Sequence, residues 1–337
     1  MNAALHDEMI VVDALQYSNW DRALFEELRA GGLTAVHVTI AYWEDARATL
    51  SAIGRWHRLF RRFDDLIMPV HDGEDIVAAK RNGKTGIILG FQNCSPIEDE
   101  LAMVEILQRL GVRVMQLTYN NQSLLGAGCY ESEDAGITRF GREVIREMNR
   151  VGMIIDMSHS AERTTLEAIE LSDRPIAITH ANPSSFHPAL RNKSDAVMRA
   201  LAETGGMLGF SLYPFHLKDG GDCTLEAFCD MAWDAAELMG VDHVGIGSDM
   251  CRNWDYRTLE WMRSGRWTFE ADYGEGSAAQ KSWPAQPPWF RTPADMPNLT
   301  AGLLARGFAE TDVAKIMGGN WLRFFTDGFR SADTAAG

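Results

Sequence analysis

The sequence has few cysteines, and none of them are closely paired. Its five cysteines are an odd number and contain no CxxC pair, so neither a disulfide framework nor a cysteine zinc finger is indicated. A dense run of Lys and Arg is also missing, and the formal net charge is −15. Because phosphate backbones are bound by clustered basic side chains, this charge excludes nucleic acid as a partner.

Long apolar runs are missing as well. No stretch of 18 apolar residues occurs, and residues 1–12 lack the basic start and the long apolar run of a signal peptide. The sequence therefore predicts a cytoplasmic protein without a membrane partner. The composition that is present, 46% hydrophobic and 23% charged over 337 residues, is that of an ordinary globular protein.

Short apolar runs alternate with amphipathic stretches along the chain. The predicted strands are Met9–Val12, Ala35–Ile40, Gly86–Phe91, Arg113–Thr118, Gly152–Met157, Ile176–Thr179, Met207–Leu212 and Val244–Gly247. The predicted helices are Ala41–Phe63, Glu98–Leu110, Arg139–Arg150, Glu162–Leu171, Ser194–Thr204 and Leu225–Leu238. This alternation indicates βα units around a parallel sheet.

The number of units favours a closed barrel over an open sheet. Eight βα units in roughly 250 residues match a (β/α)8 TIM-type barrel. An open dinucleotide-binding sheet would carry G-x-G-x-x-G after its first strand, where this sequence reads Asp13-Ala14-Leu15-Gln16-Tyr17. The sequence therefore predicts an α/β protein with one barrel domain over residues 1–337.

One segment, at about residues 251–299, departs from the alternation. It has little periodicity, several prolines and five of the ten tryptophans. Long irregular segments in compact domains are usually functional or disordered, and so many indole rings favour an ordered insertion. Its place after the eighth strand predicts a lid or a subunit contact at the catalytic rim, and the latter would imply a homodimer.

Polar side chains follow the predicted strands at the end where barrel enzymes place their chemistry. They are Gln92, Asn93, Tyr119, Asn120, Asn121, Asp156, Ser158, His159, Thr179, His180, Asn182, Tyr213, His216, Ser248 and Asp249. His159 and His180 follow neighbouring strands, as two ligands of one metal ion would. Asp249 is placed to be a further ligand or a general base. Asp156 lies inside a strand and is expected to accept hydrogen bonds. Spacing alone leaves open whether the two histidines bind a metal or only hydrogen-bond.

A longer motif leads into the first of these histidines. Residues 136–159 read GITRFGREVIREMNRVGMIIDMSH, and further short motifs follow in order. These are Pro175–His180, Arg191-Asn192 with Asp195, Val244–Asp249 and Gly319–Arg323. From about Gly86 to Phe325 the chain resembles the membrane (renal) dipeptidase family, the M19 metallopeptidases. The family's long motif, GLT-x-FG-x-x-V-x-x-x-NRLG-x-x-x-D-x-SH, matches residues 136–159.

The resemblance implies a set of roles. Family members hydrolyse dipeptides and related small amides with two zinc ions bridged by a carboxylate. His159 and His180 would be ligands of the second metal, and Asp249 would be a ligand of the first and the proton acceptor. Arg191 would bind the terminal carboxylate of the substrate, for which a guanidinium is well shaped. Asn120 and Tyr213 are further predicted substrate contacts.

Three positions depart from the family pattern. The His-x-Asp pair expected at the end of the first strand reads Leu15 and Tyr17, and the bridging Glu of G-x-E-G reads Gln92. The His after the fourth strand reads Tyr119. Because a leucine is no ligand and a neutral amide cannot bridge two dications, two metal ions are not expected. One zinc ion, or none, is expected on His159 and His180, with Gln92 and Asp249 as further ligands.

Three functions remain open at this stage. The leading prediction is a hydrolase for a dipeptide or small amide, in which Asp249 accepts a proton and Tyr119 donates to the developing oxyanion. A second is a non-catalytic barrel that binds a small ligand after losing its binuclear zinc centre. A third is metal-assisted chemistry on a small carboxylated metabolite.

Overall fold

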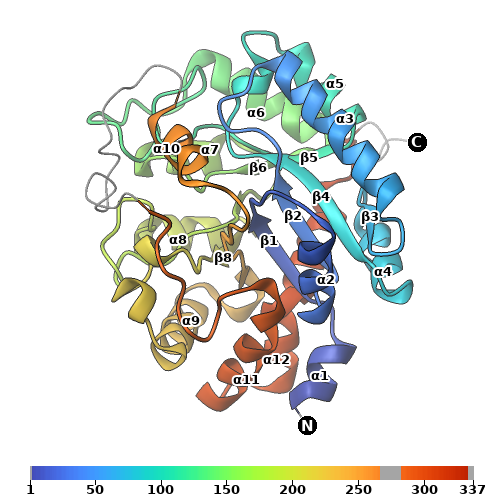
Figure 1. Cartoon of the computed structure of the whole chain (residues 1–337). Coiled ribbons are helices and arrows are strands. Elements are labelled where there is room, and N and C mark those ends of the chain that lie inside the picture. Colours follow the sequence, from blue (N-terminus) through green and yellow to red (C-terminus); the bar gives the residue numbers. More distant parts are fainter. Residues whose placement is uncertain (1, 266–281, 333–337) are drawn as a thin grey trace.

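The computed structural model describes residues 2–265 and 282–332, and its centre is a parallel β-barrel (Figure 1). The strands run in the order β1-β2-β4-β5-β6-β7-β8-β9, and β3 pairs with β4 outside this path. Their bounds are β1 Val12–Gln16, β2 Ala35–Thr39, β3 Ile67–Pro69, β4 Thr85–Phe91, β5 Val112–Gln116, β6 Ile154–Asp156, β7 Ala177–Ile178, β8 Met207–Phe210 and β9 Val244–Ile246. A parallel bridge between Gln16 and Met250 joins the two ends of this order, which confirms the predicted (β/α)8 barrel.

Helices surround the barrel on the outside (Figure 1). Their bounds are α1 Asn2–Glu8, α2 Arg22–Ala30, α3 Ala46–Arg62, α4 Gly73–Arg81, α5 Ala102–Arg109, α6 Arg139–Val151, α7 Glu162–Leu171, α8 Asp195–Glu203, α9 Leu225–Met239, α10 Tyr256–Ser264, α11 Met296–Arg306, α12 Glu310–Ala314 and α13 Asn320–Gly328. None of the helices in the described residues is long and apolar enough to cross a membrane.

The first strand prediction was wrong in its position. The strand begins at Val12 rather than Met9, and its Asp13 and Gln16 point polar groups into a fully buried environment. The Asp13 carboxylate accepts hydrogen bonds from Gln16 Nε2 at 2.8 Å and from the backbone N–H of Ser248 at 2.7 Å. A polar pair inside the barrel therefore breaks the apolar pattern by which a buried strand is recognised.

The N-terminal end of the barrel is closed by α13. Trp321 on this helix is fully buried and packs with residues from the beginnings of the strands, among them Val12 and Met207. Its Nε1 donates to the carbonyl of Ile246 at 3.0 Å. A Cβ on Gly245 would lie 2.4 Å from Trp321 Nε1, so the barrel wall accepts this ring because a glycine faces it. This plug leaves the opposite end of the barrel for ligands.

The predicted irregular insertion contains a helix. α10 lies within it, capped by the Asp255 carboxylate, which accepts from the N–H of Thr258 at 3.0 Å. Residues 266–281, which include Trp267, lie outside the described residues. The predicted helix at 41–63 begins at Ala46 instead, because Asp45 caps it and Tyr42 and Trp43 belong to the preceding loop.

Candidate active site

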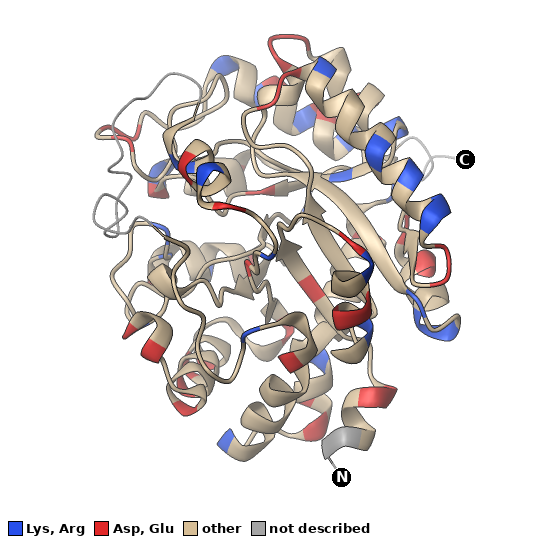
Figure 2. Ribbon diagram, in the orientation of Figure 1, with Lys and Arg blue, Asp and Glu red and all other residues tan. Residues whose placement is uncertain are grey.

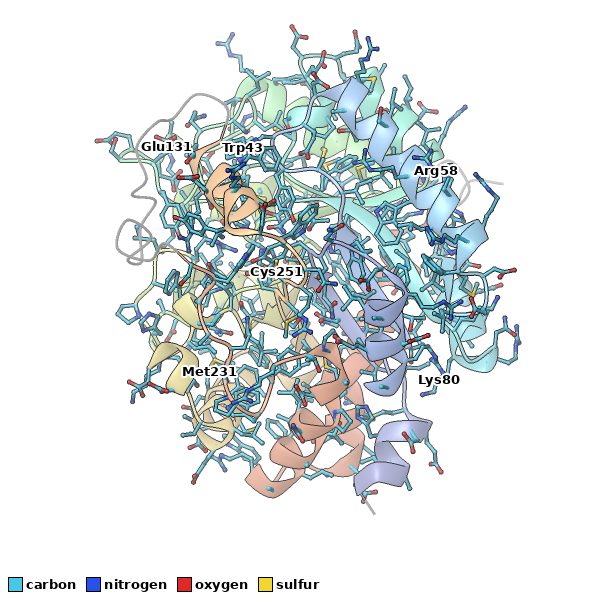
Figure 3. The ribbon with its side chains drawn as sticks, viewed as in Figure 1. Trp43, Arg58, Lys80, Glu131, Met231 and Cys251 are labelled. Carbon is cyan, nitrogen blue, oxygen red and sulfur yellow. The ribbon has the colours of Figure 1, made fainter. Side chains whose placement is uncertain are left out.

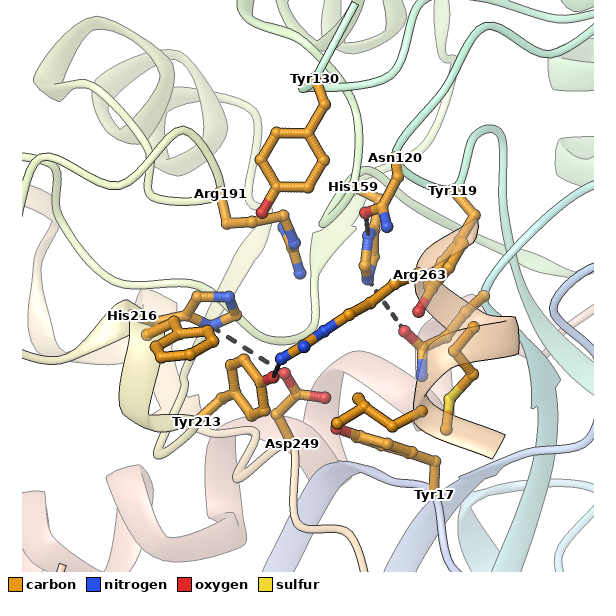
Figure 4. Close-up of a pocket in the computed structure, with 14 residues that line it drawn as sticks. Tyr17, Tyr119, Asn120, Tyr130, His159, Arg191, Tyr213, His216, Asp249 and Arg263 are labelled. Carbon is orange, nitrogen blue, oxygen red and sulfur yellow. Dashed lines mark hydrogen bonds and ion pairs between the residues drawn. The ribbon is translucent and has the colours of Figure 1, made fainter. Parts of the chain in front are cut away.

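A small cavity of about 70 Å³ lies at the C-terminal end of the barrel (Figure 4). Its lining includes seven of the eight residues predicted from the sequence: Gln92, Tyr119, Asn120, His159, Arg191, Tyr213 and Asp249. His180, the eighth, does not line the cavity: it is fully buried, and its Nε2 contacts Nε2 of His159. The barrel thus brings together side chains from β4, β5, β6, β7, β8 and β9 or from the loops that directly follow them.

The two imidazoles face each other through their Nε2 atoms, which are 3.2 Å apart. His159 Nδ1 lies 2.7 Å from Asn120 Oδ1 and its Nε2 lies 2.9 Å from Gln92 Oε1, so both ring nitrogens face acceptor atoms. His180 Nδ1 lies 2.8 Å from Thr179 Oγ1, whose own proton goes to Asp156 Oδ2 at 2.5 Å. The two Nε2 atoms and Gln92 Oε1 therefore converge, an arrangement that a cation between them would stabilise.

Asp156 holds this half of the site in place. Its carboxylate accepts from Ser158 Oγ, Thr179 Oγ1 and Gln116 Nε2 at 2.5, 2.5 and 2.9 Å. The expected role of Asp156 as a hydrogen-bond acceptor is confirmed. Through Thr179 it fixes the tautomer of His180.

Asp249 sits opposite the histidines. Its Oδ1 is 4.0 Å from His180 Nε2 and its Oδ2 is 3.9 Å from His216 Nδ1. Burial raises the pKa of Asp249 to about 8, although the Arg191 guanidinium acts in the other direction. The pKa values of His159, His180 and His216 are all lowered, first by burial and then by Arg191.

Two residues of the site have left-handed backbone conformations. Asn120 has φ of 61° and Asp249 has φ of 57°. Such strain in residues other than glycine persists where the surrounding structure enforces it, and it is concentrated at functional sites. The Asp249 N–H donates to the carbonyl of Leu15 at 3.0 Å, which holds this turn against β1.

Arg191 is almost completely buried at 2% exposure. Its Nη1 donates to the carbonyl of Ser158, and its Nη2 is 3.5 Å from the carbonyl of His180. Part of its hydrogen-bonding capacity thus anchors the two histidine-bearing loops. The guanidinium still lines the cavity, where Figure 4 places it between Tyr130 and His216.

Residues on α10 close the cavity from the insertion side. Leu259, Met262 and Arg263 line it, and Arg263 Nη2 donates to the Tyr213 hydroxyl at 3.3 Å. Figure 4 shows Arg263 extending across the site toward Asp249 and Tyr213. The sequence analysis missed Arg263, because it lies beyond the strand ends in a segment without periodicity.

The positions that would hold a first metal ion are apolar and aromatic. Leu15 is fully buried in a cluster with Tyr17, Tyr42, Trp43, Tyr119 and Met262. Among residues 2–265 and 282–332, no three or more His, Cys, Asp or Glu side chains form a group that could hold a metal ion. A two-metal centre does not fit these residues. The converging Nε2 atoms of His159 and His180, with Gln92 Oε1 2.9 Å from His159 Nε2, do fit one ion.

Comparison with known proteins decides the family. The profile of the membrane dipeptidases, peptidase family M19, matches residues 7–254. The chain belongs to the membrane dipeptidase family. The match begins well before Gly86 and so includes the altered first strand.

Named relatives are fungal dipeptidases. Dipeptidase tcpJ of Claviceps purpurea is 27% identical over 280 residues, which are 82% of this chain and 59% of that protein. Dipeptidase verJ of Clonostachys rogersoniana is 30% identical over 216 residues, which are 63% of this chain and 55% of that protein. The chain thus spans little more than half the length of these dipeptidases.

Solved structures agree with the fold. An amidohydrolase from Pseudomonas aeruginosa has a TM-score of 0.92 and 38% identity, and the match covers 97% of this chain and 99% of that one. A metallopeptidase of Rhodobacter sphaeroides, solved with a phosphinate mimic of the dipeptide L-Ala-D-Ala, has a TM-score of 0.76. That match covers 94% of this chain and 98% of that one at 17% identity, and it shows the shared fold.

Proposed function

We propose that this member of the membrane dipeptidase family hydrolyses a dipeptide or another small amide with a free carboxylate, using one zinc ion at most. The observation that carries the proposal is the convergence of three polar atoms: the Nε2 atoms of His159 and His180, 3.2 Å apart, and Gln92 Oε1, 2.9 Å from His159 Nε2. They lie beside a carboxylate, Asp249, and an arginine, Arg191, at the end of the barrel where such enzymes act.

His159 and His180 are the residues that would hold an ion, with Gln92 and Asp249 as oxygen ligands. The chemistry that zinc supplies in such a site is Lewis-acid polarisation of a carbonyl or a water. Asn120 and Thr179 would orient the two imidazoles without being ligands themselves, because each lies within hydrogen-bond distance of an Nδ1 atom and leaves the Nε2 atom for the ion.

Asp249 is proposed as the general base. A carboxylate in water is a weak base at neutral pH, whereas the pKa of about 8 that burial gives Asp249 lies near the working pH. Its Oδ2 faces His216 Nδ1 at 3.9 Å, and its Oδ1 faces the histidine pair. The carboxyl group is thus placed to take a proton from water and return it to the leaving amine.

Tyr119 and Tyr213 are proposed as hydrogen-bond donors to the substrate. Burial raises the pKa of both phenols, that of Tyr213 to about 12, so both stay protonated. The Tyr119 ring lies against His159 with centroids 4.2 Å apart, so its hydroxyl would lie near a carbonyl bound at the histidines. Arg191, with Asn120 beside it, would orient the substrate's carboxylate.

The size of the cavity limits what enters. A cavity of about 70 Å³ holds on the order of five water molecules, which is too little for a dipeptide. Leu259, Met262 and Arg263 on α10 therefore have to move when the substrate binds. The insertion would act as a lid, one of the two roles predicted from the sequence.

The proposal is tested by metal content and turnover together. Protein purified without an affinity tag is reconstituted with zinc, dialysed and measured by inductively coupled plasma mass spectrometry, then assayed on a panel of dipeptides and N-acyl amino acids. We expect about one ion per chain, lost in His159→Ala/His180→Ala, and turnover lost with it. His57→Ala, which removes an exposed histidine on α3, is the matched control. Metal binding and turnover that survive the double substitution would contradict the proposal. Two ions per chain would contradict the inference that Leu15, Tyr17 and Gln92 exclude a two-metal centre.

A second candidate function is supported by the aromatic cluster around Leu15. A barrel that has replaced metal ligands by Leu15, Tyr17 and Gln92 is suited to bind a small ligand without cleaving it. Saturable binding by isothermal titration calorimetry, without turnover of any panel member, would favour this reading. Turnover of one member would exclude it.

The single-domain organisation, the homodimer and the cytoplasmic location stay predictions. Sedimentation velocity of the full chain measures the dimer directly.

A further inference from the structure

A second and larger cavity, of about 570 Å³, lies beside the candidate active site. Its walls are the loop after β1, the loop after β2, one face of α3 and Trp254 from the insertion. A volume of this size falls in the range that small-molecule sites occupy, roughly 300–1,000 Å³. No step of the proposed hydrolysis uses this cavity.

Three indole rings form much of its surface. Trp20 and Trp56 pack at a centroid distance of 5.7 Å, and Trp56 is 5% exposed. Trp254 is 36% exposed, which makes it one of the few large apolar side chains that reach solvent. The partly exposed rings of Trp20 and Trp254, with the buried Trp56 behind them, indicate a surface that a flat apolar ligand covers.

The loop that carries Trp254 is fixed against the loop that carries Trp20. The N–H of Asn19 donates to the carbonyl of Arg252 at 2.9 Å, and Trp283 Nε1 donates to the carbonyl of Trp254 at 2.9 Å. Hydrogen bonds therefore hold the two loops that form this wall of the cavity in a fixed relative position.

The charge of the cavity is opposite to that of the protein. α3 carries five arginines and no Asp or Glu, and Figure 2 shows it as a basic stripe on a molecule of net charge −15. Arg55, Arg58 and Arg62 line the cavity, and their spacing of three and four residues places them on one face of the helix. Figure 3 marks Arg58 on this helix.

These arginines lack acidic partners within the described residues. Arg55 and Arg58 make no hydrogen bond or ion pair there, and Arg62 lies over the ring of Phe63 at 5.1 Å. Glu44 is the acid that lines the cavity, and its Oε2 already accepts from the N–H groups of Tyr42 and Trp43 at 2.6 and 3.1 Å. An anion in the cavity would therefore meet exposed guanidinium groups that are not ion-paired to an acid among the described residues.

We propose that this cavity is a second binding site, for a small aromatic carboxylate. A flat ring packs against Trp20, Trp56 and Trp254, and its carboxylate accepts from the guanidinium groups of α3. Arginine can make two kinds of contact with this ligand, because its planar guanidinium binds carboxylates in a bidentate manner and stacks on aromatic faces.

The second site is linked to the first by one hydrogen bond. Thr39 lines the second cavity, and its Oγ1 accepts from Gln92 Nε2 at 2.9 Å. Gln92 Oε1 in turn lies 2.9 Å from His159 Nε2. A ligand against Thr39 is therefore one residue away from a predicted metal ligand.

The test uses 2-naphthoate as the probe and isothermal titration calorimetry on the full chain. We expect saturable binding that weakens as NaCl is raised, and that is at least about ten-fold weaker in Arg55→Gln/Arg58→Gln. Arg61→Gln is the matched control, because Arg61 is exposed on the same helix but does not line the cavity. Trp254→Leu should weaken binding to a similar extent. Neutral 2-naphthylmethanol and inorganic phosphate should each bind about ten-fold more weakly than 2-naphthoate or not measurably.

Several outcomes would overturn the second site. They are no binding at millimolar 2-naphthoate, equal weakening in Arg61→Gln, or equal affinity for 2-naphthylmethanol. Binding that is unchanged in Arg55→Gln/Arg58→Gln but lost in Tyr213→Phe would place the probe in the first cavity instead. Because calorimetry needs no turnover, failure here is separable from failure of the proposed hydrolysis.

Discussion

The two sides of the active-site cavity are built from the same parts, the ends of parallel strands, but they differ in polarity. On the β6 to β9 side, His159 and His180 are held by a hydrogen-bonded network, and the Asp249 carboxylate lies 4.0 Å from His180 Nε2. On the β1 and β2 side, Leu15, Tyr17 and Tyr42 form an aromatic and apolar cluster. The comparison teaches that one barrel rim can keep titratable side chains on one side while its other side is filled by hydrophobic packing.

The difference has a physical basis in what each half needs. The polar half buries charges and imidazoles, which is favourable only when every group has a partner. The apolar half buries Leu15 and Tyr17 without such partners, and the rings of Tyr17 and Tyr42 pack edge to face at 6.2 Å. Four predictions break or sharpen this contrast.

The largest expected effect comes from breaking the polar half at Asp249. Asp249→Asn keeps the shape of the side chain but removes the base, so kcat should fall by about 10³-fold. Steady-state kinetics on the best dipeptide of the panel measure this. Asn120→Ala, which frees the tautomer of His159 but leaves the base, is the comparison and should cost less. An Asp249→Asn enzyme with wild-type kcat would remove Asp249 from the mechanism.

The next effect comes from converting the apolar half. Leu15→His/Tyr17→Asp/Gln92→Glu reintroduces the family's ligand types, and zinc content should rise from about one ion to two per chain. In chelator, the same variant should lose roughly 4 kcal/mol of unfolding free energy, because ionisable groups then lie unpaired in an apolar cluster. Metal analysis and urea unfolding with and without zinc test both parts. An unchanged metal content would show that the backbone of β1 no longer suits a first site.

A smaller effect concerns the pH dependence of stability. The pKa of Asp249 is about 8 in the folded chain against an ordinary 3.8. Between these values the folded state binds more protons than the unfolded state, so this group lowers the free energy of unfolding as pH rises. In chelator, Asp249→Asn should therefore be more stable than wild type by several kcal/mol at pH 8, because each unit of the pKa shift contributes about 1.4 kcal/mol, and the gain should vanish near pH 4.

Urea unfolding across this pH range measures that gain. Asp65→Asn is the control with the opposite sign, because Arg22 lowers the pKa of the Asp65 carboxyl. A gain for Asp249→Asn that does not change with pH would mean that the charge of Asp249 does not cause it.

The smallest effect concerns the lid. Arg263 on α10 reaches over the cavity to the Tyr213 hydroxyl, and it adds a second guanidinium to a site that already has Arg191. Arg263→Gln should raise KM for substrates with a second carboxylate by about ten-fold and leave kcat nearly unchanged. Arg257→Gln, on the same helix but not lining the cavity, should change neither. An equal loss for neutral and acidic substrates would assign Arg263 a structural role.

Much of the site could be predicted from the sequence because its residues directly follow the predicted strands. His159, His180 and Asp249 each come directly after a buried run, and parallel strands bring such positions to one rim. The first strand was misplaced because Asp13 and Gln16 hydrogen-bond inside the barrel. Arg263 could not be predicted because it contacts Tyr213, 50 residues away, from a segment without periodicity. The cavity beside α3 could not be predicted because it joins residues 18–62 to Trp254, about 200 residues away.

The sequence by itself determined the family, the barrel and the replacement of Leu15, Tyr17 and Gln92, because these follow from residue identity and order. Only the tertiary structure decided which Nε2 atoms face each other, the raised pKa of Asp249 and the charge of the cavity beside α3. Those properties depend on distance and burial, and both are set by packing between elements that are remote along the chain.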